Sequence, residues 1–465
     1  MRAVAGSFRD PSGFLFEHDG SLFRQVNESY RTHFDHLVSS GLYQLLVDRG
    51  LLIPHQVVAP PTPQSPARYK VIRPEVVPFV SYPYEWSFHQ LQAAARTTLE
   101  IAKLAFEHDM VLKDASAYNV QFIGSQPIFI DTLSFEIYQE GTPWVGYRQF
   151  CQHFLAPLAL MSHRDPRLNA LQQVYIDGVP LALAVSLLPR RALLRWGLFT
   201  HLYLHARAQR RYAHDETRTP GMRPHISRLG FRGLLASLEG AVRRLQLHTT
   251  RTEWSDYYAH TNYEDAAMEH KQTVVRELLA RAGGLGRVVD IGANTGQFST
   301  IASERASYTL AVDIDPLAVD QHFQRLQAAG AKSVLPLRID LSAPSPAIGW
   351  DNAERPAFLD RLGAETVLAL ALVHHLAIAN NTPLARIAAW LGRFAEHLII
   401  EFVPKSDSQV QRLLRTREDV FPEYDAEHFE TAFRRCFEIV ESRRIRGTER
   451  DLYLMRRIRA DSRAR

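Results

Sequence analysis

The chain contains little cysteine and no long apolar segment, and both absences narrow its class. Its 465 residues include two cysteines, Cys151 and Cys436, which lie far apart in apolar surroundings. This spacing excludes a disulfide framework and a cysteine-based zinc cluster, and it favours a reducing compartment. The longest apolar run, residues 179–188, contains Pro180 and is too short to span a bilayer, and residues 1–10 lack the apolar core of a signal peptide. We therefore expect a cytoplasmic protein without a membrane span.

The chain also lacks a strong excess of charge of either sign. Its formal net charge is +4, which is compatible with an anionic substrate but far below the basic stripe typical of nucleic-acid binders. The arginine-rich residues 456–465 are interpreted as a solvated tail rather than an RNA anchor. Hydrophobic residues make up 46% of the chain, enough for packed cores, and the length indicates two or three domains.

Residues 287–299 are the most informative stretch that is present. They predict a buried strand, then a glycine-containing turn, then a helix. Asp290 provides a carboxylate at the end of this strand. Gly292 and Gly296 have no Cβ, so the turn can bend tightly and expose its backbone to a ligand. A turn of this kind between a strand and a helix is where adenosine cofactors usually bind.

The residues that follow predict further strands, several of which end in an acid. The second strand, residues 308–312, is followed by Asp313, and an acid at this place can accept hydrogen bonds from two ribose hydroxyls. Later apolar runs predict strands, in chain order, at residues 334–339, 366–373, 397–400, 436–440 and 451–455. The run at residues 366–373 is apolar on both faces, as expected of a central parallel strand.

On these motifs, residues 250–465 resemble a class I S-adenosylmethionine-dependent methyltransferase. The resemblance implies an α/β fold with a Rossmann-like, seven-stranded sheet, and S-adenosyl-L-methionine as cofactor. The implied cofactor-binding residues are Asp290, Gly292, Asn294, Gly296, Asp313, Ile314, Asp340 and Leu341. Asp340 and Leu341 match the family position that contacts the adenine amino group. Asn294 stands where many members carry glycine, and asparagine also tolerates a left-handed backbone.

Two other interpretations of this half remain open. One is a dinucleotide dehydrogenase, but its fingerprint is Gly-x-Gly-x-x-Gly, which the turn from Gly292 to Gly296 does not supply. Its sheet would also not end in an antiparallel pair like the one predicted near the end of this chain. The other is a methyltransferase fold that has lost its activity.

The mechanism that the resemblance implies is direct displacement, in which an acceptor oxygen or nitrogen attacks the sulfonium methyl group in line. Such a reaction needs alignment and a base. In this family, residues at the carboxyl tips of the fourth and fifth strands face the methyl group of the cofactor. His374, His375 and Glu401 are therefore the candidate catalytic residues. His375 is the first choice as base, because an ordinary histidine pKa near 6.5 suits deprotonation of a hydroxyl at neutral pH. The alternative role of His374 is packing or capping the next helix. The aromatic residues 254–263 are interpreted as a lid or as packing.

The first half carries a second signal at residues 111–131. Asp114 and Asn119 have the D-x-x-x-x-N spacing of the protein-kinase and aminoglycoside-phosphotransferase superfamily, and Asp131 ends a strand where those enzymes place a metal-binding aspartate. This region therefore resembles their catalytic core. The resemblance implies that Asp114 accepts a hydroxyl proton, while Asn119 and Asp131 hold Mg²⁺ on the phosphates of ATP.

The residues before that motif depart from the kinase pattern. Residues 13–26 predict a hairpin, followed by a helix or two through Leu52, and no Gly-x-Gly-x-x-Gly loop precedes the motif. Lys70 falls after these helices, out of order for the phosphate-gripping lysine. Arg24 is an unusual substitute for that lysine. Three interpretations stay open: a vestigial or substrate-holding module, an active phosphotransferase, and an acidic turn with only a structural meaning.

We therefore predict an α+β kinase-like domain at residues 1–215, followed by a linker and connecting helix at 216–249 and the methyltransferase domain at 250–465. Within the first domain, a small lobe covers about 1–82 and a helical lobe about 87–212. The aromatic and basic cluster at residues 196–212 is interpreted as a helix packing face with a solvated rim.

The whole sequence resembles the rhizobial host-specificity nodulation methyltransferases, on residues 8–14, 113–136 and 401–407. The resemblance implies methylation of a small molecule or saccharide-type metabolite. Three hypotheses follow: a small-molecule methyltransferase with a positioning N-terminal module, a bifunctional kinase-methyltransferase acting on a carbohydrate with Mg·ATP as second cofactor, and a non-catalytic scaffold. The acceptor molecule, its acceptor atom and the oligomeric state are not specified by the residues.

Overall fold

The computed structural model describes residues 2–61, 67–213, 225–248, 252, 265–283, 285–415 and 418–458. By its internal contacts the chain divides into two compact units of mixed α/β structure. Unit 1 comprises Met1–Thr250 and Ala347–Pro356, and unit 2 comprises Arg251–Pro346 and Ala357–Arg465. The aromatic residues 254–263, interpreted above as a lid or as packing, lie outside the described residues.

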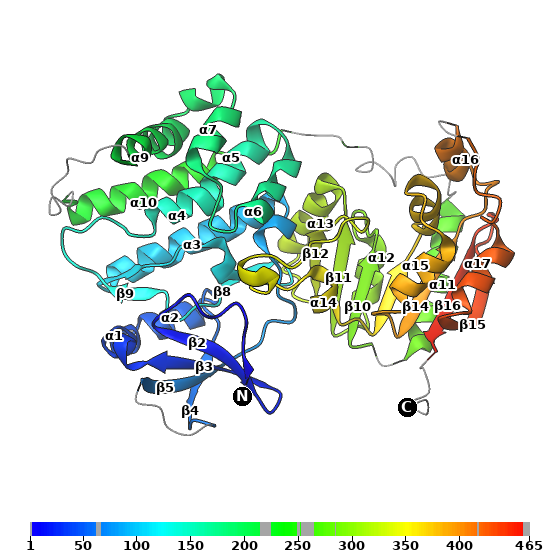
Figure 1. Cartoon of the computed structure of the whole chain (residues 1–465), viewed down its shortest axis with the longest axis horizontal. Coiled ribbons are helices and arrows are strands. Elements are labelled where there is room, and N and C mark those ends of the chain that lie inside the picture. The colour runs from blue at the N-terminus through cyan, green and yellow to red at the C-terminus, as the bar shows by residue number, and fades with distance from the viewer. Residues whose placement is uncertain are drawn as a thin grey trace. The chain divides into compact units, whose positions relative to one another are not determined.

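Unit 1 begins with a five-stranded antiparallel sheet in the order β1-β2-β3-β5-β4 (Figure 1). Its strands and the two helices beside them are β1 Arg2–Ala3, β2 Gly13–His18, β3 Ser21–Asn27, α1 Arg31–Ser39, α2 Leu42–Asp48, β4 His55–Val58 and β5 Arg68–Pro74. The expected hairpin at the start of the chain is the β2–β3 pair. The apolar side of the sheet packs Val26 of β3 and Ile72 of β5 against Phe34 of α1.

The rest of unit 1 is mainly helical and is built on the long helix α3. Ser87 caps α3 by accepting a hydrogen bond from the Gln90 amide, and the Gln90 side chain returns one to the Ser87 amide, so the predicted helix start is fixed. The elements are α3 Phe88–Glu107, β6 Met110–Leu112, β7 Val120–Ile123, β8 Gln126–Phe129, β9 Phe135–Ile137, α4 Tyr147–Phe150, α5 Ala156–His163, α6 Leu171–Val174, α7 Leu181–Leu187, α8 Trp196–Leu198, α9 His205–Ala213 and α10 Arg228–Arg243.

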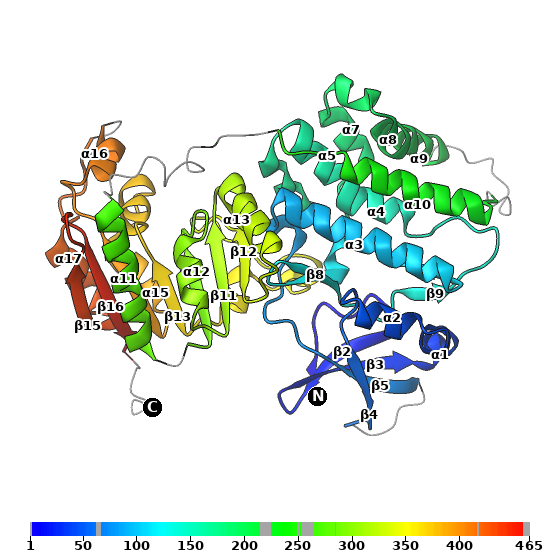
Figure 2. The ribbon, with the colours of Figure 1, turned by 180° about the vertical axis from the view of Figure 1, so that it is seen from behind.

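Helix α10 belongs to unit 1 and is not a free connecting element. It runs along α3 (Figure 2), where the rings of Phe106 and Phe231 stack with centroids 4.2 Å apart. Lys103 and Glu239 also form an ion pair of 2.6 Å between these two helices. The sequence predicted a connecting helix within residues 216–249, but it did not indicate which element that helix packs against.

The segment Ala347–Pro356 joins unit 1 although both of its ends continue into unit 2. It forms a hairpin-like turn in which Ile348 and Arg355 exchange backbone hydrogen bonds. Glu354, with its side chain 2% exposed, accepts hydrogen bonds of 2.8 and 2.9 Å from the Arg9 guanidinium. This contact was not predicted, because Arg9 and Glu354 are 345 residues apart in the chain.

Unit 2 contains a seven-stranded sheet in the order β12-β11-β10-β13-β14-β16-β15. Strand β16 is antiparallel to both of its neighbours, while the other pairings are parallel. The elements are α11 Asp265–Ala282, β10 Arg287–Ile291, α12 Gln297–Ser303, β11 Tyr308–Asp313, α13 Pro316–Ala328, β12 Val334–Arg338, α14 Phe358–Leu362, β13 Thr366–Ala369, α15 Leu384–Leu391, β14 His397–Phe402, α16 Ser408–Leu414, α17 Ala426–Phe433, β15 Phe437–Arg444 and β16 Asp451–Arg457.

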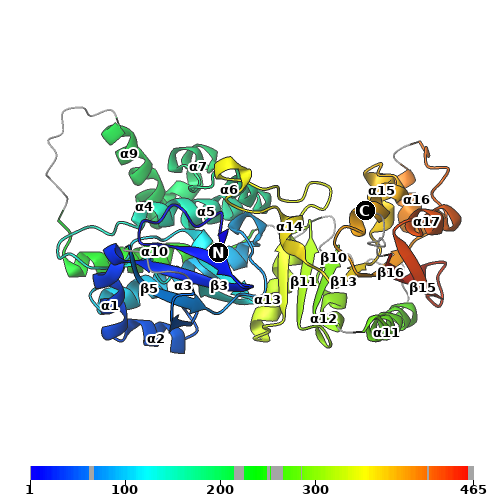
Figure 3. The same ribbon diagram turned by 60° about the horizontal axis from the view of Figure 1, so that its bottom comes forward.

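Helices cover both faces of this sheet. Figure 3 shows α11, α12 and α13 on one face and α14, α15 and α17 on the other. On the first face Val275 and Leu278 of α11 pack with Val288 of β10 in one buried cluster. Burying a side chain of this size stabilises the fold by roughly 1.5–3 kcal/mol. Every predicted strand of this half is present, and most bounds agree within a few residues.

The predicted strand at residues 366–373 needs a correction. Strand β13 ends at Ala369, and Ala371 takes a left-handed backbone with φ of 50°. The apolar run continues past this turn because the residues after it are buried as well, so hydrophobicity could not mark the end of the strand. His374 and His375 consequently lie at the start of a short helix and not at a strand tip.

None of the described helices is both long and apolar enough to cross a membrane.

Candidate functional site

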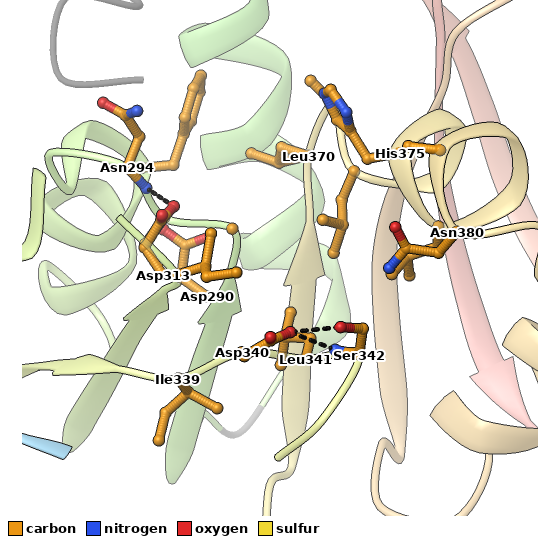
Figure 4. A pocket seen from close by; sticks show the side chains of 18 of the residues that line it. Asp290, Asn294, Asp313, Ile339, Asp340, Leu341, Ser342, Leu370, His375 and Asn380 are labelled. Carbon is orange, nitrogen blue, oxygen red and sulfur yellow. Dashed lines mark hydrogen bonds between the residues drawn. The ribbon is translucent and has the colours of Figure 1, made fainter. Parts of the chain in front are cut away.

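A pocket with a volume of about 320 Å³ opens in unit 2 beside the ends of strands β10, β11, β12 and β13 (Figure 4). Seven of the eight predicted cofactor residues line it: Asp290, Gly292, Asn294, Asp313, Ile314, Asp340 and Leu341. Parallel strands end at one edge of the sheet, so residues distant in sequence meet there. Gly296 is the exception, because it begins helix α12 outside the lining.

The glycine turn has the strained backbone that its residues allow. Gly292 and Gly296 have φ of 76° and 82°, and Asn294 has φ of 49°, so asparagine does adopt the left-handed conformation expected of it. A Cβ on Gly296 would lie 1.9 Å from the His322 ring, which makes this position sterically closed to any other residue. The part of the turn that lines the pocket runs from Gly292 to Asn294.

Two buried carboxyl groups face the pocket from neighbouring strands. Asp313 accepts hydrogen bonds from the backbone amides of Asn294, at 2.7 Å, and Asp315, at 2.8 Å. Asp290 accepts a hydrogen bond of 2.6 Å from the Ser299 hydroxyl. Burial raises the pKa of Asp290 to about 7 and that of Asp313 to about 6, because water is absent around the charged forms. The two carboxyl groups are near enough for the Asp313 charge to add to the rise at Asp290.

Apolar side chains make up another wall of the pocket. Ile314, Ile339 and Leu341 line it, a composition suited to the face of a flat ring. The Asp340 carboxylate accepts hydrogen bonds from the amide and the hydroxyl of Ser342, at 2.9 and 2.6 Å, which holds its loop in place.

The two predicted histidines have different environments. His375 lines the pocket, whereas His374 is 1% exposed and does not. Burial lowers the pKa of His375 to about 4, so its ring is neutral at pH 7 and its basicity is lower than the ordinary histidine value supposed in the sequence argument. Burial, with the neighbouring His375, lowers the pKa of His374 further.

Glu401 does not line the pocket, and its carboxylate forms ion pairs with two cationic side chains. Its side chain is fully buried, and it lies 2.6 Å from the Lys271 ammonium and 3.4 Å from the Arg450 guanidinium. Asp407 binds the same Arg450 at 2.7 Å. This arrangement resembles a structural ion-pair network, and a carboxylate held in this way is poorly placed to collect a substrate proton.

Lys271 is a pocket residue that the sequence argument missed. Lys271 lines the pocket and is 3% exposed, and its ammonium lies 4.9 Å from the centre of the Phe298 ring. Burial lowers its pKa, while the Glu401 charge opposes that shift. A signal was present, because Lys271 shares a helix face with Val274, Val275 and Leu278. Met268 and Asn380 also line the pocket and carried no motif.

The predicted phosphotransfer residues come together in unit 1, but a cation already lies among them. The Asn119 amide donates hydrogen bonds to the Asp114 carbonyl, at 3.5 Å, and to the Ser134 hydroxyl, at 3.3 Å. Asp131 forms an ion pair of 2.6 Å with Arg24, whose side chain is 10% exposed. Burial raises the pKa of Asp114, and the Asp131 charge adds to that rise.

A lysine also lies beside these residues. Lys113 donates a hydrogen bond of 2.7 Å to the Ser12 hydroxyl and lies 3.5 Å from Asp10. Arg24, the unusual substitute considered above, thus lies near the acid and not near an open phosphate site. Lys70 pairs with Asp35 on the surface and takes no part in this cluster.

A mainly parallel sheet with a pocket at the carboxyl edge of its strands, a glycine turn and an acid on the second strand places unit 2 in the class of nucleotide-cofactor-binding α/β domains. No family model matches the chain. It is, however, 37% identical over 461 residues to nodulation protein NoeA of Rhizobium meliloti (strain 1021), covering 98% of this chain and 96% of that protein. The chain therefore belongs to the NoeA family of nodulation proteins, which confirms the resemblance inferred from the sequence.

Two solved structures align with part of the chain. N-methyltransferase NodS from Bradyrhizobium japonicum WM9 is 14% identical, with a TM-score of 0.32, over 42% of this chain and 99% of its own. The bifunctional kinase-methyltransferase WbdD is also 14% identical, with a TM-score of 0.31, over 44% of this chain and 43% of its own. TM-scores of this size do not establish a shared fold.

Proposed function

We propose that the protein is an S-adenosylmethionine-dependent methyltransferase that acts on an oxygen or nitrogen of a small molecule or saccharide-type metabolite. The observation that carries the proposal is the Asp313 carboxylate at the end of β11, opposite the Gly292 turn and beside the apolar wall of Ile314, Ile339 and Leu341. This combination supplies an acceptor for ribose hydroxyls, bare backbone, and a surface for an adenine ring.

The donor set fits the cofactor on chemical grounds. Asp313 would take the ribose hydroxyls, and the Leu341 side would take the adenine. When bound, S-adenosylmethionine supplies an activated methyl group on a positively charged sulfur. The carboxyl groups of Asp290, Asp313 and Asp340 line the pocket and suit a ligand of that charge.

The protein side chains contribute alignment and exclusion of water. His375 is the pocket residue best suited to accept a proton from an acceptor hydroxyl or ammonium, since its ring is neutral at pH 7. Its low pKa makes it a weak base, so we assign most of the rate to positioning. Lys271, held by Glu401, stabilises the pocket wall.

Unit 1 is proposed to position the substrate or a partner and not to transfer phosphate. The Arg24 guanidinium satisfies the Asp131 carboxylate at the place where a phosphotransferase would hold its metal. A bifunctional kinase-methyltransferase would need this ion pair to open before Mg·ATP could bind. Among the described residues of unit 1, Asp114, Asn119 and Asp131 come together, but the Arg24 ion pair argues against that second activity.

The test of the methyltransferase proposal is transfer of label from methyl-tritiated S-adenosylmethionine to pools of hydroxylated and amino-bearing saccharides. The full chain should label at least one pool, and the Asp313→Ala variant should label none. Failure of every pool, with cofactor binding intact, would contradict the acceptor class but not the cofactor site.

A further inference from the structure

A surface of unit 1 carries exposed apolar side chains next to arginines. We define the α7–α8 patch as Leu187, Arg190, Arg191, Leu194, Arg195 and Trp196. Leu194 is 86% exposed and Trp196 is 73% exposed, and Leu187 lies at the edge with 36%. Figure 2 shows α7, α8 and α9 side by side, away from the five-stranded sheet of unit 1. Scattered surface hydrophobics are ordinary, but a contiguous group with one sign of charge is not.

The segment under these side chains is firmly seated, so their exposure is not a result of fraying. Ala192 and Leu198 are 1% and 2% exposed, within the same few residues. A Cβ on Gly197 would lie 2.6 Å from the Ala241 Cβ, which shows how closely α8 packs on α10. Leu194 and Trp196 are thus held outward by buried neighbours. This corrects the interpretation of Trp196 as part of a helix packing face.

The charge around the patch is of one sign. From Gly178 to Ala213 the sequence contains six arginines and no aspartate or glutamate. Within the described part of the chain, Arg190 and Arg191 take part in no salt bridge, and Arg195 donates only to the backbone carbonyl of Arg244, at 3.3 Å. Unpaired guanidinium groups beside exposed leucine and tryptophan form a surface complementary to a layer that is anionic outside and apolar just below.

We infer that the α7–α8 patch binds the surface of an anionic lipid membrane, with Leu194 and Trp196 entering the headgroup region and the arginines contacting lipid phosphates. Apolar insertion combined with a basic rim is the pairing that peripheral membrane binding requires. Tryptophan favours this interface because its ring is apolar and its N–H is polar. The protein lies on the membrane by this account and does not span it.

Two other occupants fit less well. A second copy of the chain related by a two-fold axis would bring the arginines of the two patches face to face without an acid between them. A nucleic acid would use the arginines and the tryptophan ring, but it offers no partner for Leu194, the most exposed side chain of the patch. The leucine is what favours lipid.

The test is co-sedimentation of the full chain with vesicles of phosphatidylcholine, alone or mixed with phosphatidylglycerol. We expect binding to the mixed vesicles and little to phosphatidylcholine alone. Replacing Leu194 and Trp196 together by serine should weaken binding at least about tenfold. The pair Arg190→Glu and Arg191→Glu should weaken it about fivefold or more for each residue and remove the preference for phosphatidylglycerol.

Trp350 provides a matched control. It is also 73% exposed, but it is followed by Asp351, and its amide donates a hydrogen bond to Glu354, whose carboxylate pairs with Arg9 and Arg355. Trp350→Ser should bind vesicles as the unchanged chain does. No binding to mixed vesicles, or equal loss in Trp196→Ser and Trp350→Ser, would overturn the inference. Binding of single-stranded RNA that the same arginines control, without vesicle binding, would also overturn it in favour of a nucleic-acid surface.

Discussion

The ammonium of Lys271 and the carboxylate of Glu401 form an ion pair of 2.6 Å in the interior of unit 2, with side chains 3% and 0% exposed. The pair links helix α11 to strand β14 beside the pocket of unit 2. A buried pair of this kind contributes little net stability as a whole, but removing one partner leaves an uncompensated charge. Glu401 therefore has a structural role that its position near the end of strand β14 did not reveal.

The first prediction concerns Glu401. Glu401→Gln leaves Lys271 and Arg450 without their shared carboxylate, so we expect the free energy of unfolding to fall by about 3–5 kcal/mol in urea titrations. Asp419→Asn is the control, because its pair with Lys405 is exposed and should cost under about 1 kcal/mol. A variant that keeps its stability but loses turnover would identify Glu401 as the base after all.

The second prediction concerns the effect of pH on stability through Asp290. Its pKa is raised to about 7 in the folded protein, above that of the unfolded chain, so the folded state holds this proton more tightly. The protonated group contributes its full share of the unfolding free energy at low pH, and this contribution is lost as the pH rises through 7. Between about pH 5 and pH 8 the unchanged chain should therefore lose roughly 2–3 kcal/mol of unfolding free energy through Asp290, and Asp290→Asn should not show this loss.

The measurement is the unfolding free energy of both proteins across that range. Asp313 is present in both proteins, so the difference reports mainly on Asp290. An identical pH dependence in the variant would show that Asp290 is already ionised in the folded state near pH 5.

How much of this pocket was predictable depends on the kind of signal. Asp290, Asp313 and Asp340 were found because strand ends and turns are local features, and local patterns are visible in one sequence. Lys271 was missed because its meaning depends on Glu401, 130 residues later. That Ala347–Pro356 belongs to unit 1 was not predicted either, because its contact with Arg9 joins residues 345 positions apart.

The environment of each group was also beyond the reach of the sequence. His375 was chosen for an ordinary pKa, whereas its burial among pocket residues lowers that pKa to about 4. In unit 1, the spacing of Asp114 and Asn119 correctly predicted that these two residues lie together. That Arg24 pairs with Asp131 is visible only in the folded structure. Residue spacing indicates which groups can meet, and not which charges remain unpaired.

The third prediction concerns His375. Replacing it by Gln should lower turnover by about a hundredfold while cofactor affinity stays nearly unchanged, because the ring contributes proton transfer and not cofactor contacts. In the unchanged enzyme, turnover should rise with pH through about 4 and be level from about pH 6 to pH 8. Steady-state rates across this range test both statements. Intact turnover in the variant, or an inflection near pH 6.5, would contradict them.

The fourth prediction concerns the ion pair of Arg24 and Asp131. Calorimetric titration of Mg·ATP into protein saturated with S-adenosylhomocysteine should give no saturable heat, because Arg24 already occupies the carboxylate. Asp131→Asn should instead lower the unfolding free energy by up to about 3 kcal/mol, since the buried Arg24 keeps only its longer ion pair with Asp10, at 3.7 Å. Saturable binding that Asp131→Asn abolishes would contradict this prediction and show that unit 1 holds a nucleotide.

The most direct test of the central claim is calorimetric titration of S-adenosylhomocysteine into the full chain, into Asp313→Ala and into Asp315→Asn. Asp315 caps helix α13 by accepting hydrogen bonds from the amides of Leu317 and Ala318, and asparagine can keep that cap, so this variant is the matched control. We predict saturable binding by the unchanged chain and by Asp315→Asn, and its loss or a weakening of about a hundredfold in Asp313→Ala. Absence of binding by the folded, unchanged chain, or equal binding by Asp313→Ala, would contradict the assignment of this pocket to the methyl donor.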